Sequence, residues 1–146
     1  LLFAGIGSYL SRYMNGLHFV SYLRVVSGIV VLLLLIVFVL RPAINLTIGL
    51  AIEYKIIIAV IISAPLSLLM GTLLPLGITR LGKTGYDELI PWCWAVNGAL
   101  SVLGSVAAIL LAITFSFNSV LLIGGAIYLL SLVFINAIAE PYARSS

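Results

Sequence analysis

Two long runs without a charged residue constrain this chain more than any other feature. Residues 56–79 and residues 89–139 contain no Asp, Glu, Lys or Arg. A helix needs about 20 mainly apolar residues to cross the roughly 30 Å hydrocarbon core of a bilayer. The second run is far too long for one crossing, so we expect it to fold back on itself. The uncharged segment 115–119 is the natural turn, and Asn118 or Ser119 is suited to cap the following helix.

The composition agrees with a lipid-embedded chain. Of the 146 residues, 64% are apolar and 8% are charged, whereas a soluble domain carries about 25% charged residues. This excludes a soluble enzyme, and it also excludes a disordered tail, which needs the opposite composition. We therefore predict an all-α, polytopic transmembrane helix bundle that forms a single domain over residues 1–146. The expected spans are residues 1–10, 23–40, 56–77, 92–114 and 119–138, the first being the cut end of a span in a longer polypeptide.

Charges and prolines define the expected ends of these spans. Arg24 and Arg41 bracket the second span, since both side chains are long enough to reach the headgroups. Pro42 is expected to end that span, and Glu140-Pro141 to end the last one. The connector 41–55 alternates apolar and polar residues as a strand does, but an unpaired strand is unstable in lipid. We expect a short interfacial helix or a bent entry to the next span.

The distribution of Lys and Arg predicts the orientation. Loops 11–22 and 78–91 and the C-terminal tail share one side of the predicted bundle. The basic residues on or flanking that side are Arg12, Arg24, Arg80, Lys83 and Arg144, against Arg41 and Lys55 on the other. Short loops rich in Lys and Arg stay in the cytoplasm. The prediction is a multi-pass protein of the bacterial inner membrane with a cytoplasmic C-terminus, where Arg80 and Lys83 approach anionic headgroups.

Small residues indicate where the helices pack. In lipid, helices associate through close backbone contact and interhelical hydrogen bonds, which favour small residues on one face. One such face follows the third predicted span: Ser63, Ser67, Gly71 and Pro75. A second follows the fourth: Asn97, Ser101, Gly104, Ser105 and Ala108. We expect both faces to pack against neighbouring helices, plausibly each other, while Leu68, Leu69, Val102, Leu103 and Leu110 meet lipid or another subunit.

Asn97 is the most polar group inside a predicted span. An unpaired amide in hydrocarbon costs several kcal/mol, so it needs a partner, either a substrate or ion or another helix. We favour a helix-to-helix hydrogen bond, because no second ionisable group joins Asn97 to form a pathway. Trp92 and Trp94 follow Pro91 at the start of this span. They are typical of the aromatic belt that fixes the depth of a helix.

Catalytic, metal and cofactor sites are not predicted in this chain. It has one cysteine, Cys93, one histidine, His18, and four scattered carboxylates, too few for a metal site or a proton relay. Residues 77–84 formally match a phosphate-binding loop, but a membrane span precedes them in place of the strand that the motif requires. We interpret them as a cytoplasmic turn. The tyrosines lack a basic groove, so nucleic acid is not an expected partner.

Several stretches resemble a known family. They include Gly71-Thr72-Leu73-Leu74-Pro75-Leu76-Gly77 and the block Pro91-Trp92-Cys93-Trp94-Ala95-Val96-Asn97-Gly98, which continues to Ser105. The chain is similar here to the membrane region of bacterial multi-span spermidine synthase-like proteins, some of them fused to major-facilitator helices. The resemblance covers most of residues 56–135. It implies that these helices accompany a soluble, aminopropyltransferase-like domain with a Rossmann-like sheet. That domain is not in this chain, so no catalytic residue is carried over.

Three functions follow as hypotheses. The first is the membrane module of a spermidine synthase-like protein, acting as an anchor or as a transporter-like helix bundle. The alternative is a structural or accessory subunit of a larger respiratory or photosynthetic complex. Both make lipids and other transmembrane helices the partners. Transport by this segment alone is the weakest hypothesis, because it needs a pair of broken helices, and only Pro65, Gly71 and Pro75 indicate one.

Overall fold

The computed structural model describes the backbone of residues 1–14, 19–83 and 85–143 and the side chains of residues 1–14, 21–83 and 85–134. The helices are α1 (Leu2–Leu10), α2 (Phe19–Thr47), α3 (Ile52–Lys83), α4 (Ile90–Thr114) and α5 (Phe117–Ala143), with 3-10 turns η1 (Ser11–Tyr13) and η2 (Asp87–Leu89). No strand occurs within these ranges, which confirms the all-α prediction. Four of the helices, α2 to α5, are long and apolar enough to cross a membrane.

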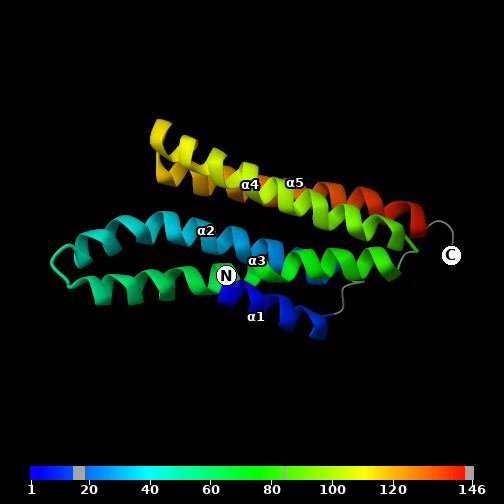
Figure 1. The fold of residues 1–146 in the computed structure, drawn as a ribbon, viewed down its shortest axis with the longest axis horizontal. Coiled ribbons are helices and arrows are strands. Elements are labelled where there is room, and N and C mark those ends of the chain that lie inside the picture. Colours follow the sequence, from blue (N-terminus) through cyan, green and yellow to red (C-terminus); the bar gives the residue numbers. More distant parts are fainter. Residues whose placement is uncertain (15–18, 84, 144–146) are drawn as a thin grey trace.

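The helices form a row rather than a closed ring. Contacts link α1 to α3, α3 to α2, α2 to α5 and α5 to α4, and α4 also touches the end of α3. Figure 1 shows this order from α1 at one edge to the α4–α5 hairpin at the other. The short helix α1 lies along the second half of α3 and runs in the same direction. Consequently α2 lies between α3 and α5, whereas α4 has no described residue that is fully buried.

The turns between helices divide between the two ends of the row. The start of α2, the turn from α3 to α4 and the end of α5 lie at one end (Figure 1). The α2–α3 and α4–α5 turns lie at the other. This is the division that the predicted spans require. The α2–α3 hairpin projects further than the α4–α5 hairpin, in keeping with helices of 29 and 32 residues against 25 and 27.

The buried core lies on α2. Val26 and Ile29 are fully buried there, and Val25 and Leu33 nearly so. Leu76 of α3 forms one cluster with Val25, Ile29 and Leu33, and partly buried side chains of α3 and α5 pack against it. Tyr22 of α2 donates a hydrogen bond to Ser131 of α5, with 3.4 Å between the two oxygens. Helix α2 therefore holds its two neighbours together by a small apolar cluster and one polar contact.

Two predicted helix ends are wrong, because prolines do not stop these helices. Helix α2 continues past Pro42 to Thr47, and α5 continues past Pro141 to Ala143. Proline lacks the N–H that would bond to the carbonyl of Phe38 four residues earlier, and membrane helices tolerate such a loss. At the end of α2 the single Thr47 hydroxyl proton is shared between the carbonyls of Ala43 and Ile44, whose oxygens lie 2.9 and 3.0 Å away. Residues 41–47 thus extend α2 and form neither a separate interfacial helix nor a bent entry to the next span.

Two further expectations need correction. Helix α3 is continuous through Pro65 and Pro75, so the structure has no interrupted helix there. The helix that follows the α4–α5 turn begins at Phe117 and is capped by Ser116, not by Asn118 or Ser119. The Ser116 hydroxyl accepts from the backbone N–H of Ser119 at 3.2 Å. Pro91 does occupy the first turn of α4, as predicted.

Candidate functional site

The closest helix contact is the crossing of α1 over α3. A Cβ atom added to Gly7 would collide with the carbonyl oxygen of Leu68, and one added to Gly71 would collide with the carbonyl oxygen of Ala4. Each glycine thus faces the residue three positions before the other glycine, and the two halves of the crossing are equivalent. Only glycine permits this separation, since any side chain would force the backbones apart. The crossing fixes α1 on α3.

The small-residue face of α3 therefore packs against a neighbour, but not the predicted one. Gly71 contacts α1, while Ser67 and Pro75 are half-buried and Ser63 is exposed. The structure does not bring this face to the small-residue face of α4. Leu69, expected to meet lipid or another subunit, packs instead on α2, where its Cδ1 lies 2.9 Å from the Cβ position of Gly28. That part of the expectation is wrong.

The small-residue face of α4 points away from the rest of the chain. Asn97, Ser101, Gly104 and Ser105 are exposed, and Ala108 is half-buried. No neighbouring atom lies within 4 Å of a Cβ built on Gly104 or on Gly98, which follows Asn97 in the sequence. Val102, Leu103 and Leu110 on the remaining surface are also exposed. Helix α4 therefore presents two chemically different uncovered surfaces, one small and polar and one large and apolar.

The serines of this face satisfy their own hydrogen-bonding groups. Ser101 donates to the carbonyl of Asn97 at 2.7 Å, and Ser105 to the carbonyl of Val102 at 2.8 Å. Such bonds to the preceding turn let a hydroxyl lie in hydrocarbon without a partner helix. Asn97 differs, because its side-chain amide makes no hydrogen bond within the described part of the chain. Its two N–H donors and its carbonyl oxygen thus have no partner among the described residues.

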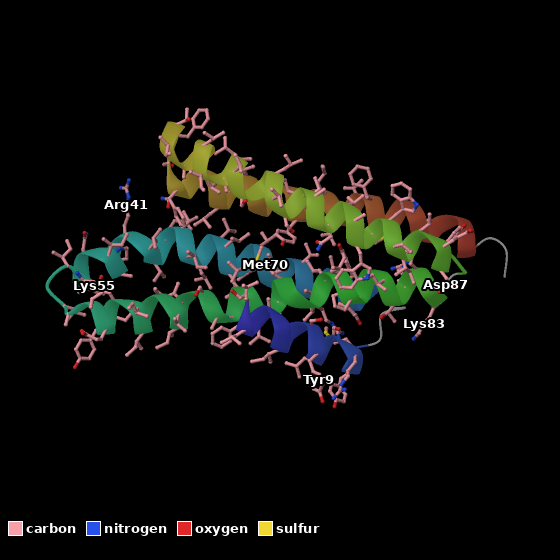
Figure 2. The ribbon with its side chains drawn as sticks, viewed as in Figure 1. Tyr9, Arg41, Lys55, Met70, Lys83 and Asp87 are labelled. Atoms are coloured by element: carbon pink, nitrogen blue, oxygen red, sulfur yellow. The ribbon has the colours of Figure 1, made fainter. Side chains whose placement is uncertain are left out.

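The predicted anchors lie near the ends of the helices. Arg24, Arg41 and Lys83 are exposed and Arg80 is half-buried. Figure 2 shows Lys83 and Asp87 at one end of the row and Arg41 and Lys55 at the other. Trp92 and Trp94 are both exposed in the first turns of α4. Lys55 also ties the α2–α3 turn, donating to the carbonyl of Ile48 at 3.1 Å.

The segment that matches a phosphate loop is a helix end. Residues 77–83 belong to α3, so their backbone N–H groups serve the helix. Gly85 has φ +82°, and the N–H of Tyr86 bonds to the carbonyl of Leu81 at 3.1 Å. This pattern, a left-handed glycine followed by a bond that spans five residues, is the Schellman ending of a helix. The turn interpretation is therefore the one that the geometry supports.

The structure brings no metal-binding cluster together within its described residues. No group of three or more His, Cys, Asp and Glu side chains occurs there. Glu53 lies in the first turn of α3, and Asp87 and Glu88 form η2 at the other end of that helix. His18 and the side chain of Glu140 lie outside the described residues. Cys93 is half-buried and free in the first turn of α4.

One side-chain cluster was missed by sequence reasoning. The Arg12 guanidinium carbon lies 3.4 Å from the centroid of the Tyr9 ring and 4.9 Å from that of Tyr13. The i, i+3 and i, i+4 spacing on a helix that continues into η1 was the available signal. The contact of Gly7 with α3 was also missed, because Gly7 and Leu68 lie in different helices that only the fold brings together.

No protein-family model, curated protein or solved structure matches the chain.

Proposed function

We propose that this chain is a membrane-embedded anchoring and assembly module whose α4 receives further transmembrane helices. One observation carries the proposal: Asn97 has an unpaired amide on an exposed, small-residue face of a helix long enough to span a membrane. Such an amide is costly in hydrocarbon. A neighbouring helix that approaches closely over Gly104 would supply its partner. The uncovered face thus favours an assembly role over that of an isolated anchor.

The first candidate for what the module anchors is a soluble, aminopropyltransferase-like domain, as in spermidine synthase-like proteins. The support is the resemblance of residues 56–135, above all the block from Pro91 to Gly98. The second candidate is an accessory role in a respiratory or photosynthetic complex. The open row of helices supports it, because the described residues that contact α4 lie on α5, α3 and the adjacent turn η2, and most of its surface is exposed.

Intact-mass measurement of the native protein, purified in a mild detergent, separates these candidates. One much larger polypeptide would favour the fused protein. A species near 15.6 kDa with several co-purifying subunits would favour the accessory role. A single species of that mass, monomeric and without any partner, would contradict the assembly role itself.

Replacing Asn97 with leucine tests the α4 face directly. We expect partner association to weaken by about 1 kcal/mol, the scale of one interhelical hydrogen bond in membranes. The unfolding free energy of the isolated chain should not fall, because the amide makes no bond within it. Association is measured by energy transfer between labelled partners in nanodiscs. Val102→Leu, an exposed position on the same helix, is the control, and an equal loss in that variant would count against the proposal.

The proposed orientation places the α3–α4 turn and the C-terminus in the cytoplasm of a bacterium. In a Cys93→Ala background, a membrane-impermeant thiol reagent applied to intact cells should leave Lys83→Cys unmodified. The same reagent should modify Lys55→Cys, which lies at the opposite end of the row (Figure 2). Both side chains are accessible enough for the comparison, Lys83 being exposed and Lys55 half-buried. The reverse labelling pattern would invert the assignment.

A further inference from the structure

The cluster of Tyr9, Arg12 and Tyr13 holds a cation in a defined orientation. The guanidinium of Arg12 stacks on Tyr9 at 3.4 Å, and its Nη2 donates to the Tyr13 hydroxyl at 3.0 Å. The two rings meet edge to face with centroids 6.5 Å apart. A guanidinium has five N–H donors, so this arrangement occupies one and leaves four. The rings thus fix the orientation of the guanidinium but leave most of its N–H donors without an acceptor.

The cluster stands on a rigid support. It begins in the last turn of α1, which the Gly7–Gly71 crossing holds against α3. Ser11, between Tyr9 and Arg12 in the chain, is buried, and its hydroxyl donates to the carbonyl of Ser8 at 2.6 Å. The η1 turn also contacts α3. The arginine is therefore positioned by the fold, although Arg12 and both rings remain exposed.

The charge of Arg12 is not neutralised within the described part of the chain. Its side chain contacts the two tyrosines, and no carboxylate bonds to it there. In Figure 2, Tyr9 lies in the half of the molecule that carries Lys83, away from Arg41 and Lys55. Two exposed apolar side chains lie on α1 beside the cluster in the sequence, Ile6 before Tyr9 and Leu10 directly after it. An unpaired cation beside apolar side chains fits a ligand with a phosphate and acyl chains.

We propose that Tyr9, Arg12 and Tyr13 form a binding site for the phosphate of an anionic phospholipid. The remaining N–H groups of Arg12 donate to the phosphate oxygens, a geometry that guanidinium matches better than ammonium does. The tyrosine rings lie among the headgroups, where such side chains are favoured. The acyl chains then run along Ile6 and Leu10. This site requires membrane embedding but not the assembly role, so the two proposals fail independently.

Native mass spectrometry of the full chain tests the site. The protein is titrated with phosphatidylglycerol in detergent, and the dissociation constant of the first bound lipid is measured. We expect Arg12→Gln to weaken binding about fivefold, as for the loss of one basic residue near an anionic headgroup. Arg12→Lys should weaken binding as well, because lysine keeps the charge but lacks the planar guanidinium that stacks on Tyr9 and donates in pairs. Arg41→Gln, at the opposite end of the molecule, should leave it unchanged.

Several results would overturn the proposal. Unchanged lipid binding in Arg12→Gln would show that Arg12 does not form the site. Full binding in Arg12→Lys would show that the lipid is attracted by charge alone. An equal loss in Arg41→Gln would do the same. In a second experiment the protein is titrated with inorganic phosphate in place of the lipid. If phosphate binds alone, with the same dependence on Arg12 and an equal affinity, the ligand is free phosphate and the lipid assignment is wrong. Helicity measured by circular dichroism confirms that each variant is folded.

Discussion

Replacing Gly71 with valine is expected to detach α1 from α3. The new Cβ would meet the carbonyl oxygen of Ala4 and lie 2.7 Å from its carbonyl carbon, and backbone atoms cannot yield as a flexible side chain can. Overpacking of this kind costs about 1–3 kcal/mol and sometimes more. Gly7→Val should act in the same way through Leu68. We expect the double variant to lose little more than either single one, because both remove the same crossing.

The matched controls are glycines with open space around them. Gly77 lies on the same helix as Gly71, and Gly5 on the same helix as Gly7, and neither has an atom within 4 Å of its Cβ position. Spin labels at the exposed positions Leu2 and Ile61 report the distance between α1 and α3. The distance distribution should broaden in Gly71→Val and stay narrow in Gly77→Val. A narrow distribution in both would show that the crossing does not hold α1.

Replacing Leu33 with alanine is expected to destabilise the row by about 2 kcal/mol or more, within the range for buried Leu-to-Ala changes. Leu33 is 5% exposed and belongs to the cluster that joins α2 to its neighbours. Its Cδ1 also lies 3.6 Å from the Cβ position of Gly125 on α5. The loss would come from van der Waals contacts and from the cavity, since lipid is as apolar as the core.

Leu35 provides the control, because it is the same residue type two positions along the same helix and is 51% exposed. Leu35→Ala removes the same atoms from a surface that faces outward. We expect a change of less than about 0.5 kcal/mol, as for surface substitutions in general. Unfolding is followed by circular dichroism during titration with a denaturing detergent. If Leu33→Ala and Leu35→Ala lowered the free energy of unfolding equally, the buried core would not lie on the face of α2 that carries Leu33.

Much of the fold was predictable because charges mark where a chain must leave hydrocarbon. The two charge-free runs indicated the turn at residues 115–119, and α4 and α5 do separate there. Helix ends were less predictable. Proline at position 42 was expected to stop α2, but the helix continues to Thr47. Proline removes one backbone hydrogen bond, and a membrane helix tolerates that loss, so the presence of proline does not by itself fix a helix end.

The pairing of the helices could not be predicted, for a physical reason. A soluble helix has one apolar face that shows where its neighbour lies, whereas a helix in lipid is apolar on all sides. Small residues then indicate which face of a helix is packed, but they do not indicate which helix packs there. Gly71 contacts Ala4 on α1 and not the face that holds Asn97. Whether the Asn97 face binds a helix remains a prediction of the assembly proposal.

The buried core and the exposed helix α4 lie in different parts of the row. Leu33 and the other buried residues of α2 lie in the interior of the row, whereas α4 lies at its margin and has no described buried residue. Under the assembly proposal, a helix that docked on α4 would extend the row at its end and leave the contacts among the other helices unchanged. Substitutions on the exposed surface of α4 would then alter which partner binds without altering the buried core on α2.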